Sequence, residues 1–463
     1  MDEAANSTAG SPAGGNHAHP LRIVRRALAT PGRFVRPWYG SYLLLGLVTA
    51  GMLPVLLPLT IKAAAHDLAT VAYVMGAYNL GLLTSPLWGM AAERFTLYRS
   101  LFFTGFVVTI AATSVFPLLD SLATWTAAGF ALGAGSAAAA TVATLFVVDF
   151  RARAEWEPRI GLLQGFNGAG QVLGLALAAG FSGGSVGSLH AGLWLAAAAL
   201  LPTLVLGHMG LPVAAQARPR DEARRTLPRH LDIHGLAAFP RLGHPAGLSF
   251  HFHHLNWQGL RRLPEIVGTR FSRFLLSWFA VTFAVGGFFT YFPLMLRRDY
   301  GVAPSTSTLV YAASAGVGIA LFVLASLWAK KVGAGHVYRA GLALRTVGFT
   351  LLGLPFVVPL ADRAQVGIAG FALVVLAWPI LSVAGTALAA RLSPFSEGAA
   401  MGLFNATLAV GSMLGAFASG PLVGRFGYQA IVAVALAGLA GSMALAVRLE
   451  APLETAAAPA LGE

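Results

Sequence analysis

The chain has 463 residues, of which 56% are hydrophobic and only 11% are charged, and its mean hydropathy is +0.70. Soluble domains carry about 25% charged residues, so this composition excludes an ordinary soluble protein. The absence of cysteine excludes a disulfide framework and a thiolate metal site.

Apolar stretches recur along the chain, each about long enough for a helix to cross a hydrocarbon core of roughly 30 Å. Because lipid offers no partners to backbone polar groups, each stretch is predicted to be a helix. The first six stretches are expected at 40–61, 69–91, 100–119, 123–149, 160–182 and 190–211. The second six are expected at 273–296, 305–329, 338–360, 365–388, 398–422 and 428–448.

The predicted fold class is an all-α membrane protein built from two six-helix bundles related by pseudo-two-fold symmetry. The N-terminal bundle is expected at 38–211 and the C-terminal bundle at 271–449. The remaining segments are a disordered basic tail, a central loop and a disordered C-terminal tail, at 1–37, 212–270 and 450–463. The central loop contains His251, His253 and His254, but no nearby Cys or carboxylate completes a metal site. We therefore interpret it as a solvated linker.

The net charge of +13 follows the predicted membrane topology. Most of the 31 Lys and Arg residues lie in the N-terminal tail, in the loops after even-numbered stretches and near the C-terminal end. This bias obeys the positive-inside rule and places both termini in the cytoplasm. Membrane orientation explains the charge, so a nucleic-acid partner is not expected.

The two predicted halves resemble each other in sequence at a constant offset of 241 residues. Gly170 and Gly174 in the fifth stretch correspond to Gly411 and Gly415 in the eleventh. Two glycines four residues apart leave a flat helix face that a neighbouring backbone can approach closely. We therefore predict matched helix-packing sites in both halves, as in secondary transporters built from repeats.

The loop after the second stretch carries Gly89, Glu93 and Arg94. These residues resemble the signature Gly-x-x-x-Asp-Arg-x-Gly between the second and third helices of the major facilitator superfamily. Glu93 replaces the Asp, Thr96 stands in place of the second Gly, and the basic pair that follows is reduced to Arg99. The paired bundles, the long central loop and the cytoplasmic termini also resemble this family of transporters.

The resemblance implies that this loop latches the two halves together when the central cavity faces outward. Glu93, Arg94 and Arg99 would form the latch with Gly89, and Asp149 at the end of the fourth stretch is a further candidate. The alternative is that these charges are solvated at the level of the lipid headgroups, where ion pairs contribute only about 0–1 kcal/mol.

Two patterns of the proton-coupled members of this family are missing. Such members often have an Arg in the fourth helix, four residues before a Gly, whereas here Gly129 precedes Gly133. Drug antiporters often have Gly-Pro in the fifth helix, and the corresponding pair here is Gly170 and Gln171. Both departures argue against a standard proton/drug antiporter.

A polar stripe follows one face of the fifth stretch, where Gln164, Asn167 and Gln171 stand at i, i+3 and i+7. Asn405 and Ser412 occupy corresponding places in the eleventh stretch. An unpartnered amide in lipid is costly, so these faces are expected to point at a water-filled cavity or at a neighbouring helix. Hydrogen bonding between helices is the alternative for each residue. The matched stripe favours the cavity for Gln164, Asn167 and Asn405 taken together.

Other stretches supply further cavity candidates, namely Tyr78, Asn79, Tyr311 and Trp378. A charge at the bilayer centre costs about 2.5–3.5 kcal/mol and usually marks a transport path, but no Asp or Glu lies in the middle third of any stretch. Arg345 lies only about seven residues, roughly 10 Å, into the ninth stretch, so its side chain is expected to reach the interface. The centre is therefore predicted to be polar but uncharged.

These features predict a secondary transporter that moves a small organic molecule across the plasma or inner membrane by alternating access. We expect a monomer in the lipid bilayer, with no cofactor or metal and with or without a coupling ion. A proton-driven drug or metabolite antiporter is the alternative within the family. A membrane-embedded enzyme and a non-transporting receptor or scaffold are the alternatives from other classes.

Overall fold

The computed structural model describes residues 36–65, 67–148, 156–211, 268–394 and 397–449. The first half contains α3 (Tyr39–Leu45), η1 (Gly46–Met52), α4 (Leu53–Ala65), α5 (Leu68–Leu82), α6 (Ser85–Phe95), α7 (Tyr98–Val115), η2 (Phe116–Leu118), α8 (Leu122–Val148), α9 (Trp156–Ser182), α10 (Val186–Leu200) and α11 (Pro202–Gly210). The second half contains α15 (Arg270–Tyr300), α16 (Pro304–Val332), α17 (Ala334–Gly353), η8 (Leu354–Phe356), α18 (Arg363–Leu392), α19 (Glu397–Phe426), α20 (Gln429–Ala446) and η9 (Val447–Leu449).

Helices coincide with every predicted apolar stretch, and the described residues form no strand. Within the described residues, ten helical segments are long and apolar enough to cross a membrane, judged by length and composition. α9 and α17 are outside this group. α9 carries Gln164, Asn167 and Gln171, and α17 carries Arg339 and Arg345, so polar residues lower the hydropathy of both helices.

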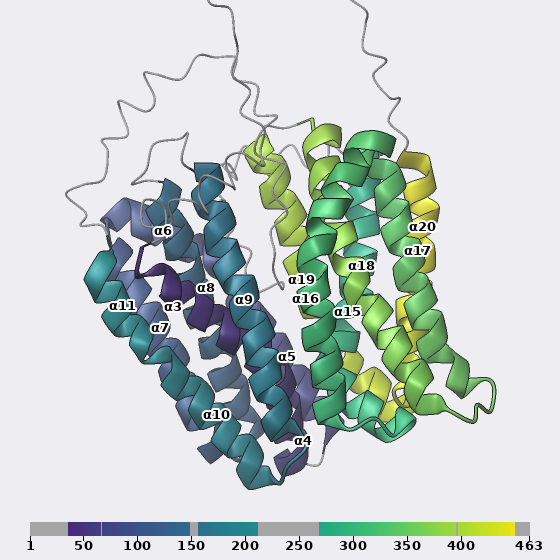
Figure 1. Ribbon diagram of the computed structural model, residues 1–463, viewed down its shortest axis with the longest axis horizontal. Coiled ribbons are helices and arrows are strands. Elements are labelled where there is room, and N and C mark those ends of the chain that lie inside the picture. Colours follow the sequence, from purple (N-terminus) through teal and green to yellow (C-terminus); the bar gives the residue numbers. More distant parts are fainter. Residues whose placement is uncertain (1–35, 66, 149–155, 212–267, 395–396, 450–463) are drawn as a thin grey trace, which may run out of the picture.

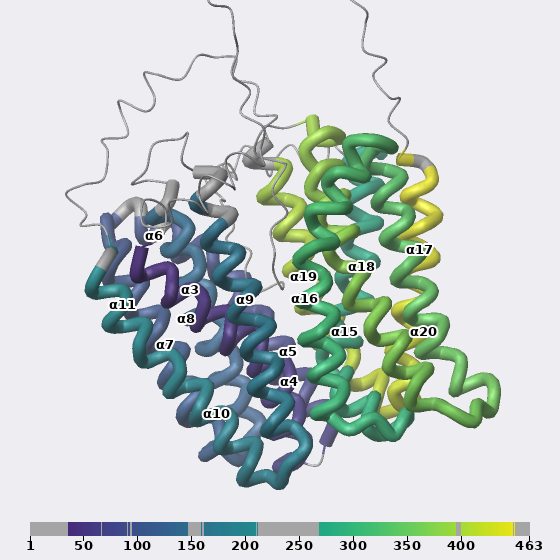
Figure 2. Tube along the Cα trace, viewed as in Figure 1, coloured from purple at the N-terminus to yellow at the C-terminus, as the bar shows by residue number. Residues whose placement is uncertain are grey.

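The helices form two bundles that stand side by side (Figures 1 and 2). The first half of the chain, coloured purple to teal, forms the left bundle, and the second half, coloured green to yellow, forms the right bundle. α5 packs against α19, and α9 packs against α16, so two helices of each half build most of the boundary between the halves. The histidine run of the central loop lies outside the described residues.

The paired glycines allow the closest helix crossings in both halves. A Cβ atom added at Gly174 in α9 would lie 1.9 Å from the carbonyl oxygen of Leu47 in η1. A Cβ atom added at Gly415 in α19 would lie 1.9 Å from the carbonyl oxygen of Phe283 in α15. An added Cβ atom at Gly170 would clash with the carbonyl oxygen of Leu43, and one at Gly411 would clash with the side-chain oxygen of Thr282, so all four glycines stand at crossings too close for a larger residue.

The first membrane helix is interrupted by a π-helical segment, η1, between α3 and α4. The N–H of Leu53 donates to the carbonyl of Val48, a bond that spans five residues instead of four. Pro54 follows directly and has no N–H to donate. The wider turn therefore ends where the proline removes a helical hydrogen bond, and π turns of this kind are frequent at functional sites.

Candidate functional site

A cavity of about 140 Å³ lies between the two halves. Its walls come from α4, α5 and α9 in the first half and from α15, α16, α17, α18 and α19 in the second. Most of its lining is apolar, with Leu57 and Met75 on one side and Phe289, Phe322 and Val375 on the other. An apolar cavity with a few polar groups is the usual form of a small-molecule site.

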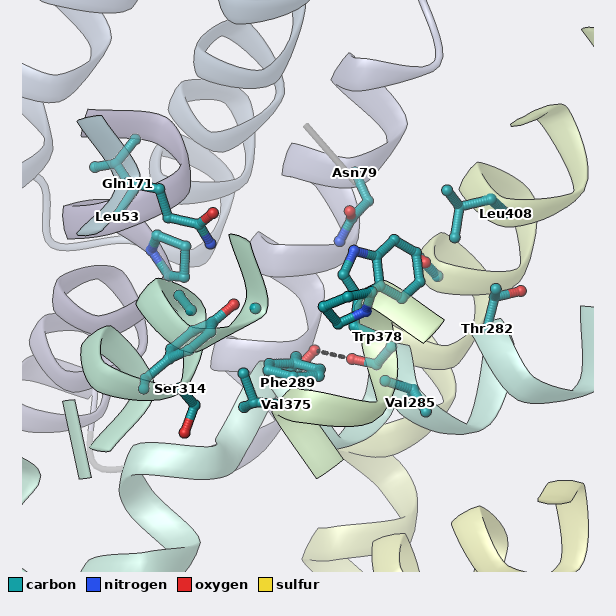
Figure 3. Close-up of a pocket in the computed structure, with 18 of the residues that line it drawn as sticks. Leu53, Asn79, Gln171, Thr282, Val285, Phe289, Ser314, Val375, Trp378 and Leu408 are labelled. Atoms are coloured by element: carbon teal, nitrogen blue, oxygen red, sulfur yellow. Dashed lines mark hydrogen bonds between the residues drawn. The ribbon is translucent and has the colours of Figure 1, made fainter. Parts of the chain in front are cut away.

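Polar residues from both halves line this cavity, and Figure 3 shows the amides of Asn79 and Gln171 pointing into it. Asn79 and Gln171 come from the first half, and Ser314 and Trp378 come from the second. Thr282 also lines the cavity, but its hydroxyl donates to the carbonyl oxygens of Trp278 and Phe279 in its own helix. The side-chain nitrogen of Asn79 donates to the carbonyl oxygen of Met75 at 2.8 Å, so its own helix fixes the orientation of this amide. The cavity therefore offers hydrogen-bonding groups on opposite walls.

Six of the nine residues predicted for the cavity line it: Tyr78, Asn79, Gln171, Tyr311, Trp378 and Ser412. The other three, Gln164, Asn167 and Asn405, are buried but are not among the lining residues. The Nδ2 atom of Asn167 donates to the carbonyl oxygen of Tyr42 in α3 at 3.4 Å. For Asn167 the structure thus shows the helix–helix contact, because the glycine face of α9 brings it against the first membrane helix.

Arg345 corrects the prediction of an uncharged centre. Its side chain is only 1% exposed and lies in the cavity wall. One guanidinium nitrogen, Nη2, donates to the carbonyl oxygen of Val374 in α18 at 3.2 Å. The guanidinium also lies over the ring of Trp378, 5.8 Å from its centroid.

The predicted extension of Arg345 to the interface is wrong because α17 begins earlier than expected. The helix starts at Ala334, so Arg345 lies eleven residues into it, a rise of roughly 16 Å. An arginine side chain cannot cover that depth. Arg345 lies deeper inside its predicted stretch than the other charged residues do, and this was the signal that could have identified it.

Aromatic side chains hold Arg345 and Trp378 in place. The ring of Trp278 in α15 stacks on Trp378 with centroids 6.0 Å apart, and on Phe404 in α19 with centroids 4.7 Å apart. Sequence reasoning missed Trp278 and Phe404 because fully buried aromatic residues are common in any helix bundle. Their stacking gives the charged wall of the cavity a rigid backing.

Direct contacts join the two halves at one end of the molecule, the lower end in Figure 1. The hydroxyl of Tyr291 in α15 donates to the carbonyl oxygen of Leu68, the first residue of α5. An added Cβ atom at Gly183, just after α9, would lie 3.6 Å from the Cβ of Ser305 in α16. These contacts bring the halves together at the end that carries the α4–α5 and α15–α16 turns.

The predicted latch lies at the opposite end and is only partly within the described residues. An added Cβ atom at Gly89 would lie 3.5 Å from the side chain of Thr141, an ordinary contact, so the space would admit alanine. Arg99 is partly buried near the start of α7. Asp149 and the side chains of Glu93 and Arg94 lie outside the described residues, and the latch stays a prediction.

The loop of the latch has a strained backbone. Thr96, where the signature has glycine, ends α6 in the left-handed conformation with φ 54°. At the counterpart loop of the second half, Gly333 ends α16 with φ 87°. Both halves therefore use a helix end with positive φ, but only the second half has the residue that adopts it without strain.

The sequence of residues 39–334 matches the family model described as Major Facilitator Superfamily. The chain belongs to the Major Facilitator Superfamily. This membership makes it a multi-pass membrane protein and a secondary transporter of small molecules, not an enzyme. Among curated proteins, no sequence matches this member of the superfamily.

Solved structures support the superfamily fold. The chain is similar to a point mutant of the nucleoside transporter NupG, with a TM-score of 0.65 and 13% sequence identity, over 89% of this chain and 98% of that one. It is also similar to NupG without that mutation, with a TM-score of 0.64 and 13% identity, over 89% of this chain and 97% of that one. At this identity the likeness concerns the fold.

Proposed function

We propose that the protein carries a small organic molecule across the plasma or inner membrane by alternating access, with both termini in the cytoplasm. The observation that supports this best is the cavity between the halves, whose polar groups come from both sides of the boundary. Two rigid bundles that rock about such a site expose it to each face of the membrane in turn.

The conformation described here is proposed to be the inward-facing one. The positive-inside rule assigns the end with the α4–α5 turn to the outer face, and this is the end where Tyr291 bonds to Leu68 and Gly183 meets Ser305. Closure at the outer face leaves the cytoplasmic face as the route by which cargo reaches the cavity.

The test is transport by the purified protein in proteoliposomes. Because NupG is a nucleoside transporter, radiolabelled nucleosides belong in the first panel, together with small organic acids and amides. We expect counterflow of at least one labelled compound into vesicles preloaded with the same compound. Binding of a compound without any movement would contradict the proposal and favour a receptor or scaffold.

The cavity lining favours facilitated transport, or coupling to an ion other than the proton, over proton antiport. Among its described residues there is no Asp, Glu, His or Lys that could carry a proton. We expect uptake into proteoliposomes to change less than twofold when a pH gradient of about one unit is imposed. Uptake that follows the gradient and is abolished by a protonophore would support the antiporter instead.

A further inference from the structure

Arg345 has hydrogen-bond donors that the protein does not use. A guanidinium carries five N–H donors in a planar fork. The Nη2 atom donates to Val374, but Nε and Nη1 have no hydrogen-bond partner, although the side chain is 1% exposed. The guanidinium has two edges with two N–H donors each, one formed by Nε and Nη2 and the other by Nη1 and Nη2. Nη2 has two hydrogens, one on each edge, and the bond to Val374 uses one of them. At least one complete edge of the guanidinium therefore has no hydrogen-bond partner, although its nitrogens are buried.

The positive charge of Arg345 also has no counter-charge. It is the only charged residue among the described residues that line the cavity, and no carboxylate forms an ion pair with it in the described part of the chain. The groups that face it are the phenols of Tyr311 and Tyr338 and the ring of Trp378, all of them neutral. A buried cation without a partner is unfavourable, so the site is electrostatically incomplete.

We propose that Arg345 binds the carboxylate of the transported molecule, and that the cargo is an organic monoanion. This inference rests on the proposed transport function and names its substrate class. The free edge of the guanidinium matches the two oxygens of a carboxylate in a bidentate pair. A single cation balances a single negative charge. A phosphate monoester, with a charge near −2 at neutral pH, would leave about one charge uncompensated in an apolar cavity.

The remaining walls describe the body of this anion. Leu57, Phe289 and Phe322 present apolar surface, so we expect an aromatic or branched aliphatic body rather than a sugar-like one. The ring of Trp378 lies between the guanidinium and the ring of Trp278, so it adds apolar surface to this wall of the cavity. Asn79 and Ser314 are available for one or two polar substituents.

The experiment compares carboxylates with neutral molecules of the same shape. The thermal unfolding temperature of the purified full-length protein in detergent is measured with benzoate, phenylacetate and hexanoate, and with benzamide, phenylacetamide and hexanamide. Phenyl phosphate serves as the dianion. We expect at least one carboxylate to raise the unfolding temperature by a few degrees, with its amide and phenyl phosphate giving smaller shifts.

Substitutions assign the effect to the guanidinium. Arg345→Gln should abolish the carboxylate-specific shift, and Arg345→Lys, which keeps the charge but loses the fork, should weaken carboxylate binding at least tenfold. Arg339→Gln is the matched control, since Arg339 is on the same helix but does not line the cavity. This control should bind carboxylates as the unmodified protein does. If Arg345→Gln does not fold, Arg345→Lys still gives the comparison.

The proposal is overturned if no carboxylate stabilises the protein more than its amide, or if Arg345→Lys and Arg339→Gln bind the carboxylate equally well. Proteoliposomes separate this outcome from failure of the proposed function. Movement of nucleosides or amides without carboxylate binding would retain the transporter and reject the monoanion. Arg345-dependent carboxylate binding without movement of the bound compound would reject transport and retain the site.

Discussion

At the scale of single residues, two positions depart from what their surroundings require. Arg345 is a charge in an apolar core, and Thr96 is a β-branched residue in the left-handed conformation. Such departures tend to persist where function requires them, because they reduce stability. For Arg345 the proposed cargo provides that function. Thr96 lies at the end of the loop that resembles the family signature, so the predicted latch is the candidate function there.

Thr96→Gly should stabilise the protein by about 1 kcal/mol, because glycine adopts positive φ without steric cost whereas a β-branched residue does not. The measurement is the thermal unfolding temperature in detergent. Thr126→Gly is the matched control within α8, where Thr126 bonds to Leu122 in regular helix. There the same substitution should destabilise by a similar amount. Equal effects of both substitutions would show that Thr96 is not strained.

The sequence could indicate which polar residues lie within the helices but not which way all of them point. Gln171, which belongs to the stripe predicted from spacing along the fifth stretch, lines the cavity, and so do Tyr78 and Asn79. Asn167 lies on the same face as Gln171, yet it bonds to the first membrane helix. The distinction depends on where a neighbouring backbone crosses, and this crossing is a tertiary property that periodicity does not contain.

At the scale of elements, the crossing of α9 with η1 and the crossing of α19 with α15 repeat one design. In both crossings, two glycines four residues apart allow close packing against the first membrane helix of the same half. This part was predictable, because the glycine pairs recur at a fixed offset in the sequence. The π-helical η1 was not, because Pro54 alone predicts a kink and not the wider turn that precedes it.

Gly174→Ala should destabilise the protein by about 1–3 kcal/mol, because the added methyl group overpacks the crossing against Leu47. Gly180→Ala is the matched control on the same helix, since an added Cβ there has no neighbour within 4 Å. That control should be neutral or stabilising by about 0.5–1 kcal/mol, because alanine favours helix over glycine. Thermal unfolding of both variants gives the comparison, and equal losses would argue against a tight crossing.

At the scale of the whole molecule, the two-bundle fold could be predicted from the sequence. Each apolar stretch is long enough for a helix to cross the bilayer, and this identifies the membrane helices of both halves. It could not yield the conformational state, which depends on contacts between residues more than a hundred positions apart. Gly183 and Ser305 are such a pair, and they lie at the end where the halves meet. Because the chain contains no cysteine, these contacts can be tested with introduced cysteines alone.

The double substitution Gly183→Cys with Ser305→Cys should form a disulfide, because the separation of 3.6 Å between their Cβ atoms suits that bond. The disulfide should hold the halves together at this end and reduce transport at least tenfold, and reduction by dithiothreitol should restore it. Each single cysteine variant is the control and should transport normally before and after oxidation. Full transport by the cross-linked protein would show that the halves need not separate here.

The cavity is unequally divided between the bundles, and this has a consequence for how cargo preference can change. Arg345, Trp378, Tyr311 and Ser314 all belong to the second half, whereas the first half contributes mainly Asn79 and Gln171 as polar groups. Under the proposed binding mode, a cargo would travel with the second bundle while the first moves past it. Substitutions in the second half should then alter what is carried, and substitutions in the first should alter how fast it is released.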